Sequence, residues 1–314
     1  MQAKSNVIHY LLSVGAMLVF MSCQNTTDAN AQNLNGKYGL NTYNTPEVVE
    51  ELEYIEKNVK PLSPKPDARI LVTGSTAGMG QLTAKTLIAK GYKVVLHARN
   101  EKRADDAKRD LPGAEAVVIG DLSDLNAVKK LADDINALGK FDVIIHNAGV
   151  NQGQAGGDTI FNVNSLAPYI LTSLVHKPKQ LIYVSSDLHR GGSLQLENMQ
   201  SGTPNISYSD TKLQILTLSK AVARKWPDVR ANAITPGWVS TRMGRSNAPD
   251  NLRLGYSTLV WLAEGKDEAA QTSGQFFFQS RIEPNYNKIA DDTTAQDALL
   301  DAYFNVTNVP FPKN

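Results

Sequence analysis

Residues 73–80 read Thr-Gly-Ser-Thr-Ala-Gly-Met-Gly and stand between an apolar run at 70–72 and a helical pattern at 81–90. A glycine-rich turn between a strand and a helix lets the backbone approach a phosphate closely. The helix N-terminus then adds amide donors and the positive end of its dipole. Glycine-rich turns are common, so it is the strand–turn–helix context that makes this one informative. The stretch predicts a dinucleotide-binding fold.

Apolar runs alternate with helical patterns from residue 68 onward. Continuous apolar runs are expected when helices cover both faces of a parallel sheet. Gly91 and Gly139 mark helix ends, and Ser123 marks a helix start. Right-handed βαβ units of this kind predict an α/β fold with a Rossmann-type doubly wound parallel sheet in a single main domain. Strands are predicted at 70–72, 94–96, 116–119, 143–145, 181–184, 231–234 and 276–278.

The composition of the chain limits the classes of function. Its 314 residues are 42% hydrophobic and 20% charged with a formal net charge of +1, which fits one globular α/β domain with appendages. Lysine and arginine are scattered rather than clustered, so nothing indicates nucleic-acid binding. A single cysteine excludes an internal disulfide framework and a cysteine-rich metal site. The five histidines have no metal-type spacing, so no metal site is predicted.

The sequence pattern of residues 1–23 predicts a signal or membrane-anchor segment. Residues 7–21 are mostly apolar, follow Lys4 and end at Ser22-Cys23. They are short for a membrane span and have the length of a signal-peptide core. A small residue before Cys23 resembles a bacterial lipoprotein signal, whose cysteine becomes a lipidated N-terminus at a membrane. The alternatives are an uncleaved hydrophobic anchor and a mis-chosen start codon with a cytoplasmic product.

Residues 24–67 predict a polar linker with one short helix before a main domain at 68–314. Residues 24–45 are rich in Asn, Thr, Gln, Gly and Ala, and such a segment buries too little surface to offset its ordering entropy. Thr45 suits the cap and Pro46 the first position of the helix. Its apolar stripe is expected to pack on the main domain, with partner binding as the alternative. The stripe consists of Val48, Val49, Leu52, Ile55 and Val59.

A second motif, Tyr208-Ser209-Asp210-Thr211-Lys212, lies far downstream in a predicted helix at 208–225. Tyr208 and Lys212 are four residues apart, so they share one helix face. This spacing lets the ammonium lower the pKa of the phenol from about 10 and makes it a usable acid or base. Alone, such a pair is mostly a solvated helix face. Here the ends of three other strands carry Asn147-Ala148-Gly149, Ser185-Ser186 and the run Pro236-Gly237-Trp238-Val239-Ser240-Thr241.

With these motifs together, residues 68–278 resemble the short-chain dehydrogenase/reductase family, in the branch with the Thr-Gly-x-x-x-Gly-x-Gly turn. The run Val-Ser-Ser-Asp-Leu-His at 184–189 and the long interval from Ser186 to Tyr208 look closest to retinol-dehydrogenase-like members. The resemblance implies an alcohol dehydrogenase or carbonyl reductase that transfers a hydride between NADP(H) and a small-molecule alcohol or carbonyl substrate. It also implies a homo-oligomer.

Four catalytic residues follow from the resemblance. Tyr208 would exchange a proton with the substrate oxygen, and Ser186 would hydrogen-bond that oxygen and stabilise its developing charge. Lys212 would lower the pKa of Tyr208 and bind the nicotinamide ribose. Asn164 would hold a water molecule in a proton relay. His189 is expected to be a loop residue rather than a base, because Tyr208 fills that role.

The resemblance also implies a cofactor site. Arg99 stands where a carboxylate would accept the ribose hydroxyl of NAD, and a guanidinium there suits the 2′-phosphate of NADP. A surface arginine and NAD as cofactor are the alternatives, since Ala77 stands where many NADP users carry a basic residue. Lys102 and Arg103 are expected to be solvated, and Asp121 is an alternative helix cap. The implied cofactor-binding residues are Gly74, Ser75, Thr76, Gly78, Met79, Gly80, Arg99, Asp121, Leu122, Asn147, Ala148, Gly149, Tyr208, Lys212, Pro236, Gly237, Val239 and Thr241.

The substrate is less well specified. Residues 188–205 and 242–262 are expected to form its walls, and their apolar side chains suggest an apolar or mixed substrate. Two other classes of function remain open. One is a catalytically idle nucleotide-binding interaction or sensor protein, and the other is a structural surface lipoprotein that binds no nucleotide. The expected wall residues include Leu194, Leu196, Met243, Leu252, Leu254 and Tyr256.

Overall fold

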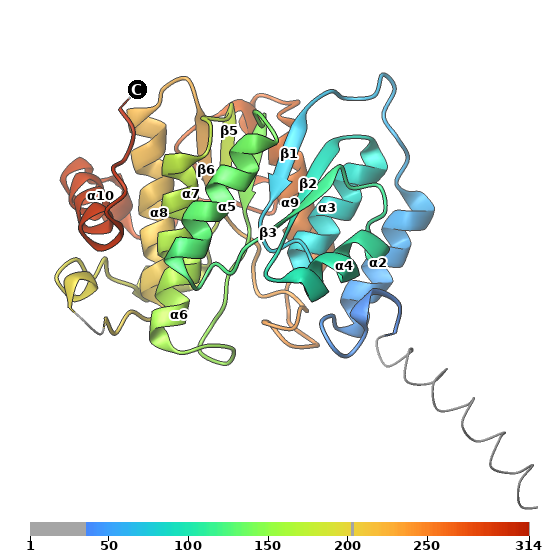
Figure 1. Ribbon diagram of the computed structural model, residues 1–314, viewed down its shortest axis with the longest axis horizontal. Coiled ribbons are helices and arrows are strands. Elements are labelled where there is room, and N and C mark those ends of the chain that lie inside the picture. Colours follow the sequence, from blue (N-terminus) through green and yellow to red (C-terminus); the bar gives the residue numbers. More distant parts are fainter. Residues whose placement is uncertain (1–35, 202–203, 314) are drawn as a thin grey trace, which may run out of the picture.

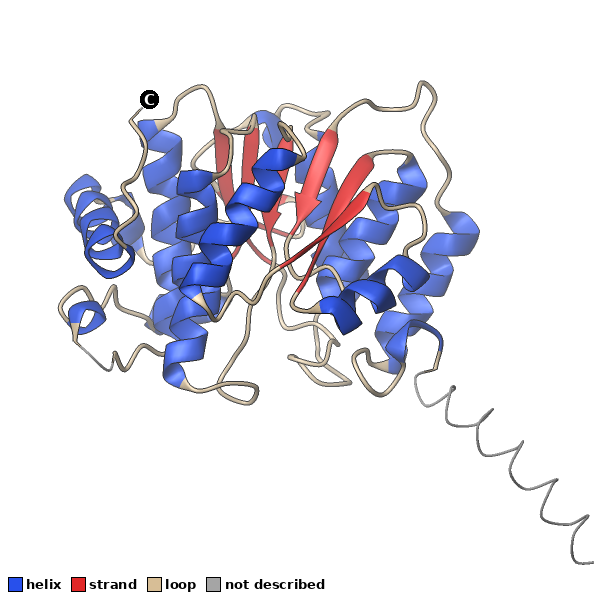
Figure 2. Ribbon diagram, in the orientation of Figure 1, coloured by secondary structure: helices blue, strands red, loops and turns tan. Residues whose placement is uncertain are grey.

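The computed structural model describes residues 36–201 and 204–313. At its centre is a sheet with the strand order β3-β2-β1-β4-β5-β6-β7-β8, and helices cover both of its faces (Figure 2). The hydrophobic segment at 7–21 and Cys23, on which the anchor prediction depends, lie outside the described residues. None of the helices within the described ranges is long and apolar enough to cross a membrane.

All seven predicted strands are present and pair in parallel. The prediction of a doubly wound parallel sheet is therefore confirmed. The sequence did not indicate β8 (Arg281–Ile282), an exposed two-residue strand that pairs antiparallel with β7. The parallel strands are β1 (Arg69–Val72), β2 (Lys93–Ala98), β3 (Ala116–Ile119), β4 (Val143–His146), β5 (Gln180–Val184), β6 (Arg230–Thr235) and β7 (Phe276–Phe278).

Two helical layers enclose the sheet. Helices α5, α7 and α8 bury apolar side chains in one core cluster, and α3, α4 and α9 bury theirs in the cluster on the other face. Most helices end as their sequences indicate: Gly91 ends α3 with a φ of 98°. The bounds are α2 (Pro46–Asn58), α3 (Gly78–Lys90), α4 (Glu101–Asp110), α5 (Leu125–Ala137), α6 (Gly157–Phe161), α7 (Ala167–Leu174), α8 (Tyr208–Lys225), α9 (Leu252–Glu264) and α10 (Thr293–Thr307).

Helix starts are set by small polar side chains. Helix α8 begins at Tyr208 as predicted, with a capping box between Ser207 and Asp210. Helix α5 is capped by the Asp124 side chain, so the prediction that Ser123 caps it is wrong by one residue. The Ser123 hydroxyl donates instead to a carboxylate nearby.

The chain reverses its winding between β1 and β4, which lie side by side although β2 and β3 separate them in sequence. Ligands of doubly wound sheets bind at such a switch point, beyond the carboxyl ends of the strands. In Figure 1 these ends point toward the lower edge of the molecule. The dark-blue segment 36–45 and the orange loop 236–251 gather at the same edge.

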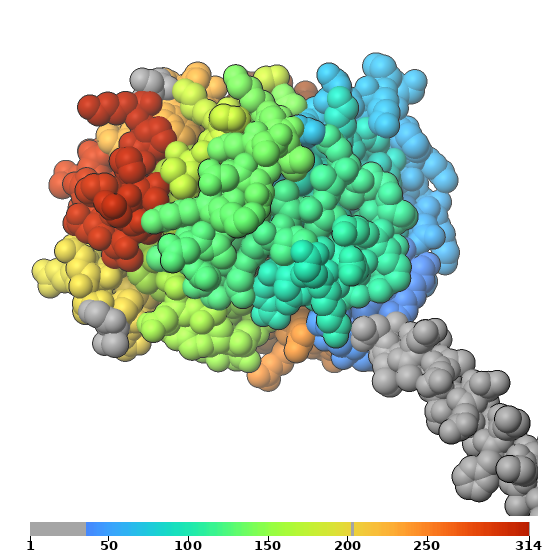
Figure 3. Space-filling model, in the orientation of Figure 1, coloured from blue at the N-terminus to red at the C-terminus, as the bar shows by residue number. Residues whose placement is uncertain are grey.

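The segment before the first strand is folded onto the main domain from residue 36 to the end of α2. Residues 36–45 contain the short 3₁₀-helix η1 (Lys37–Gly39), and the side chains of Tyr38 and Asn44 are buried. The interpretation of this part as a linker is wrong, because buried hydrogen bonds and one aromatic ring compensate for its polar composition. Helix α2 begins at Pro46 as predicted, and its apolar stripe packs against α3. Figure 3 shows this blue segment on the side of the molecule opposite the red C-terminal helix.

Candidate active site

Two hydroxyl groups meet where β5 ends and α8 begins. Ser186 follows β5, and its hydroxyl accepts a hydrogen bond from the Leu188 backbone N–H at 3.3 Å. Tyr208 is the first residue of α8, and the Ser186 side chain lies near enough to act on the pKa of its hydroxyl. The Tyr208 hydroxyl also lies 3.9 Å from the Met243 sulfur. The fold thus places the predicted pair Ser186 and Tyr208 at the carboxyl edge of the sheet.

Lys212 lies one turn further along α8 and reaches the end of β5. Its Nζ donates to the Val184 carbonyl oxygen at 2.8 Å and lies 5.3 Å from the centre of the Tyr208 ring. The side chain is only 4% exposed. The Ser185 hydroxyl donates to the backbone carbonyl of Lys212 at 2.7 Å. These bonds fasten α8 to β5 and hold the ammonium beside the phenol.

Burial shifts the two titratable groups of this cluster in opposite directions. It raises the pKa of Tyr208 to about 12, while the nearby Ser186 side chain acts the other way. It lowers the pKa of Lys212 from 10.5 to about 8. Without cofactor or substrate, the pKa of Tyr208 therefore lies above its usual value, because burial of the phenol has the largest effect. The expected effect of Lys212 on this phenol stays a prediction.

Asn164 lies in the π-helical turn η2 (Asn162–Leu166), a type of turn found frequently at functional sites. Its Oδ1 accepts from the Val150 N–H and its Nδ2 donates to the Val150 carbonyl, both at 2.9 Å. A β-carbon added at Gly149 would lie 3.4 Å from both Asn164 Oδ1 and Lys212 Nζ. The side chains of Asn164 and Lys212 therefore converge on the segment that follows β4.

The glycine-rich turn leaves no room for side chains on its inner face. A β-carbon at Gly80 would overlap the Gly74 carbonyl oxygen and Asn147 Nδ2, and one at Gly74 would lie 2.9 Å from Ala148 Cα. Gly74 and Gly78 also adopt φ values of 63° and 56°, which favour glycine. The glycines are required because the turn packs directly on the segment after β4.

Side-chain hydrogen bonds fix the turn from two neighbouring strands. The Gly74 N–H donates to His97 Nδ1 at 3.0 Å, and the His97 N–H donates to the Ser75 hydroxyl at 2.9 Å. Asn147 Nδ2 donates to the Thr73 carbonyl at 2.9 Å. Ser75 and Asn147 are among the predicted cofactor contacts, and in the structure their side chains hold the shape of the turn.

The start of α3 suits a bound anion. The first N–H groups of a helix have no intrahelical partner, and the cap residue Ala77 offers no side-chain acceptor. The Gly78 N–H donates to Asn44 Oδ1 at 2.7 Å, which leaves the N–H groups of Met79 and Gly80. Together with the helix dipole and the missing β-carbons of Gly78 and Gly80, they form a cradle that fits a pyrophosphate.

Two arginines follow β2, and the structure separates them. Arg99 is exposed, and within the described residues its side chain forms neither a hydrogen bond nor an ion pair. Arg103 is buried, and it donates to the Thr76 carbonyl at 2.7 Å and to the Asp106 carboxylate at 2.6 Å. The expectation of a solvated Arg103 is wrong, because α4 turns this side chain toward the glycine-rich turn. Lys102 is exposed as expected.

The residues expected at the adenine face inward. Asp121 accepts from the Ser123 N–H at 2.9 Å and from its hydroxyl at 2.7 Å, so it shapes the turn after β3. Leu122 is buried in the core cluster of α5, α7 and α8. The alternative of Asp121 as a helix cap is wrong, since Asp124 caps α5.

The loop after β6 approaches the glycine-rich turn. A β-carbon at Gly78 would lie 3.8 Å from the Thr241 side chain, so Thr241 faces the turn. Val239 is buried in a third core cluster with α2. Gly237 has a φ of 80°, and a β-carbon there would lie 2.6 Å from the Asp250 carboxylate. The loop is therefore held in one conformation at its start.

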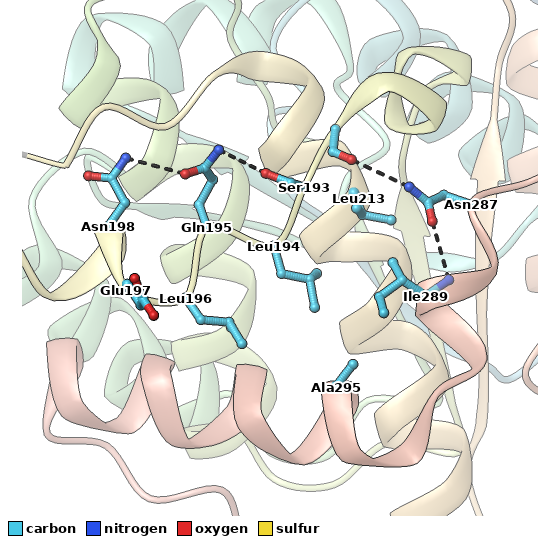
Figure 4. A pocket seen from close by; sticks show the side chains of 11 residues that line it. Ser193, Leu194, Gln195, Leu196, Glu197, Asn198, Leu213, Asn287, Ile289 and Ala295 are labelled. Carbon is cyan, nitrogen blue, oxygen red and sulfur yellow. Dashed lines mark hydrogen bonds between the residues drawn. The ribbon is translucent and has the colours of Figure 1, made fainter.

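The expected substrate walls are only partly at this site. Met243 lies beside the Tyr208 hydroxyl, whereas Leu252 and Tyr256 are buried against α2. Leu194 and Leu196 line a groove of about 900 Å³ that none of the predicted catalytic residues line. Figure 4 shows Leu194 and Leu196 directed toward α10. The assignment of these four side chains to the substrate wall is wrong. Leu194 and Leu196 are displaced because the loop at 192–198 folds back onto α10, and Leu252 and Tyr256 face α2.

His189 links the loop after β5 to the segment that contains Asn287. Its Nδ1 contacts the Ser186 carbonyl at 2.5 Å, and its Nε2 accepts from the Asn287 N–H at 3.2 Å. Burial lowers its pKa, so the ring is held neutral. These contacts agree with a structural role in the loop.

Two residues of this edge were missed by sequence reasoning. Asn44 bonds the glycine-rich turn from a segment that reads as a linker, and the only sequence signal was its nearness to the predicted cap Thr45. Arg103 supports the same turn, and no local pattern distinguishes it from the solvated residues of α4. No group of three or more His, Cys, Asp or Glu side chains within 36–201 and 204–313 is arranged to hold a metal ion.

Comparison with known proteins identifies relatives. A family model described as short chain dehydrogenase matches residues 68–252. An uncharacterized oxidoreductase of Emericella nidulans is 42% identical over 254 residues, which cover 78% of this chain and 98% of that protein. Human retinol dehydrogenase 14 is 27% identical over 277 residues, covering 72% of this chain and 82% of that protein.

Solved structures share the fold. Pseudomonas aeruginosa RhlG, determined as an active-site complex with NADP, matches with a TM-score of 0.56 and 21% identity. The match covers 67% of this chain and 94% of that one. At this identity the likeness supports the arrangement of helices and strands alone.

Proposed function

The chain belongs to the short-chain dehydrogenase family of oxidoreductases, and on that premise we propose that it transfers a hydride between NADP(H) and a carbonyl or alcohol substrate. The observation that carries the proposal is the cluster at the start of α8. There Tyr208 lies near Ser186 and beside the buried Lys212. A nicotinamide dinucleotide supplies the hydride when it is bound at this edge of the sheet.

Tyr208 is the proton donor in the direction of carbonyl reduction. Because burial holds its pKa at about 12, the phenol keeps its proton at neutral pH. It gives that proton to the substrate oxygen as the carbonyl carbon receives the hydride, and an alcohol results. Ser186 donates a hydrogen bond to the same oxygen and stabilises its negative charge. Alcohol oxidation runs the same steps in reverse.

Lys212 stabilises the phenolate that Tyr208 becomes. With a pKa of about 8, the ammonium remains mostly charged at neutral pH. It lies 5.3 Å from the ring centre in a site shielded from water, where charges interact more strongly than in solvent. Asn164 orders the segment at Val150 and Gly149 between these groups. Its role in holding a relay water and the contact of Lys212 with the ribose are part of the same proposal.

We propose NADP rather than NAD as the cofactor. Arg99 offers an exposed guanidinium without an ion-pair partner among the described residues, and a guanidinium matches a phosphate in charge and geometry. The pyrophosphate is assigned to the start of α3, at Met79 and Gly80.

Replacing Tyr208 with phenylalanine tests the mechanism. The ring and its packing stay, so NADPH should bind with nearly the wild-type dissociation constant, measured by fluorescence titration. Turnover of carbonyl substrates should fall by at least about 10²-fold, because the proton donor is lost. Tyr54→Phe makes the same chemical change on an exposed face of α2 and should leave turnover unchanged.

The outcomes separate two classes of function. Near-normal turnover in Tyr208→Phe would exclude the assigned mechanism. A wild-type protein that binds NADPH but reduces nothing in a broad panel of ketones and aldehydes would instead favour an idle nucleotide-binding sensor. Membrane attachment through Cys23 and homo-oligomer formation have support from the sequence alone and stay predictions.

A further inference from the structure

A segment outside the family match reaches into the cofactor edge. The family match begins at residue 68, and the contacts described here come from residues 38–47, which we call the N-terminal strap. The alignment with the Emericella oxidoreductase uses 98% of that protein but only 78% of this chain. The strap therefore lies outside the part of the chain that the family model matches, and its contacts with that part call for an explanation.

Asn44 is the centre of the strap. It is only 3% exposed, and both ends of its amide are bonded. Oδ1 accepts from the Gly78 N–H at 2.7 Å, while Nδ2 donates to the Tyr38 carbonyl and to Gln81 Oε1, each at 2.7 Å. The cap residue Ala77 has no side chain for this purpose. Asn44 of the strap thus caps α3, which has no capping side chain of its own.

A second contact reaches the same turn through an arginine. The Arg103 guanidinium lies 3.5 Å from the centre of the Tyr43 ring, and it donates to the Thr76 carbonyl at 2.7 Å. A cation over an aromatic face is attracted by the ring. Tyr43 therefore holds Arg103 in place, and Arg103 in turn holds the backbone of the turn.

The other side of the strap holds the loop after β6. The Thr45 hydroxyl donates to the Ser240 carbonyl at 3.0 Å, and Arg242 donates to the Thr42 carbonyl at 3.0 Å. Since the Thr241 side chain lies close to Gly78, the strap joins the glycine-rich turn to the loop after β6. One segment of ten residues then fixes their separation.

The chemistry of an amide fits this position. A carboxylate would also accept the Gly78 N–H, but its charge would repel a pyrophosphate at the same helix N-terminus. The neutral amide satisfies one donor and leaves those of Met79 and Gly80 for the ligand. Its Nδ2 donors also suit the two oxygens that surround it, which a carboxylate would not.

We propose that Asn44 is a positioning residue for the nicotinamide dinucleotide, through which the strap keeps the glycine-rich turn in its binding conformation. This inference rests on the proposed function, because it requires a dinucleotide at the start of α3. Asn44 acts through Gly78 and does not touch the reacting atoms. Its loss should therefore weaken cofactor binding while the rate at saturating cofactor stays close to that of the wild type.

The test compares Asn44→Ala with Glu51→Ala. Glu51 lies on α2 and pairs with Arg253 at 2.9 Å, remote from the turn, so its loss loosens the same appendage without touching Gly78. Thermal melting of the proteins without nucleotide should show that both variants lose a few degrees. NADPH titration by fluorescence should show at least about tenfold weaker binding for Asn44→Ala, and no more than about twofold for Glu51→Ala.

A second variant covers the case in which Asn44→Ala fails to fold. Tyr43→Leu removes only the ring beneath Arg103 and should weaken NADPH binding by about threefold or more. Equal affinities in Asn44→Ala and wild type, or an equal loss in Glu51→Ala, would overturn the role of the strap. If Asn44→Ala does not fold, a wild-type affinity in Tyr43→Leu would do so. A wild-type protein that binds neither NADPH nor NADH would overturn the proposed function as well, so the two failures are distinct.

Discussion

The turn after β1 and the turn after β5 lie at one edge of the same sheet, but they are held differently. The first is fixed by side chains from four directions: Asn44, His97, Arg103 and Asn147 all bond its backbone. The second bonds chiefly to its own neighbours and to the C-terminal segment through His189. It leaves Leu188 59% exposed.

The difference corresponds to what each turn meets. A cofactor is the same in every turnover, so a rigid, fully bonded cradle lowers the entropic cost of binding it. In the proposed site the turn at Ser186 borders the substrate, and an open turn with an exposed apolar side chain adapts to what it binds. This difference explains why the sequence predicts the class of cofactor but not the substrate.

The largest effect is expected from filling the first turn. Gly80→Ala places a β-carbon against the Gly74 carbonyl and Asn147, so backbone must shift, and the free energy of unfolding should fall by at least about 3 kcal/mol. In the second turn, Gly191 has nothing within 4 Å of an added β-carbon, and Gly191→Ala should change stability by no more than about 0.5 kcal/mol. Urea unfolding of both variants measures the contrast. Similar losses in the two would mean that the turns are packed alike.

The next effect depends on pH and tests the support of the second turn. The pKa of Lys212 is lowered from 10.5 to about 8 by burial, so between these values the unfolded chain binds more protons than the folded one. Stability due to this group therefore rises with pH in that window. Between pH 8 and pH 10, the free energy of unfolding of the wild type should rise by about 2–3 kcal/mol relative to that of Lys212→Met.

Urea unfolding without nucleotide at several pH values measures this gain. The raised pKa of Tyr208 acts only above pH 10 and in the opposite direction, and it is present in both proteins. If the free energy of unfolding has the same pH dependence in wild type and Lys212→Met, Lys212 is as well solvated as a surface lysine.

The smallest effect concerns the rim of the first turn. Arg99→Asp removes an attraction for the 2′-phosphate and adds a repulsion, while the carboxylate suits the ribose hydroxyl of NAD. NADPH binding should weaken roughly ten- to a hundredfold, about 1.5–3 kcal/mol, relative to NADH. Lys102→Asp reverses the charge of an exposed residue of α4 in the same way and serves as the control. If the ratio of NADPH to NADH affinity is the same in Arg99→Asp as in the wild type, Arg99 does not contact the cofactor.

The sheet and the start of α8 were predictable because their signals are local. Apolar runs between turns predicted every parallel strand. The predicted helix at 208–225 agrees with α8, whose start the structure shows to be fixed by Ser207 and Asp210. The contacts of Asn44 and Arg103 were not predictable, because single polar residues acquire their role from partners far away in sequence. Leu194 and Leu196 were assigned to the wrong wall because an apolar loop residue does not reveal which surface its loop folds against.

The strap also has a consequence for the order of synthesis. Its bonds to the loop after β6 span long stretches of chain: 195 residues separate Thr45 from Ser240, and 200 separate Thr42 from Arg242. Its contact with Gly78 spans only 34 residues. Closing a long loop costs more entropy than closing a short one, so the contact with the glycine-rich turn can form early and the contacts with the loop after β6 form later. A ribosome-bound chain that stops before Ser240 has the strap on its glycine-rich turn but lacks the second set of bonds.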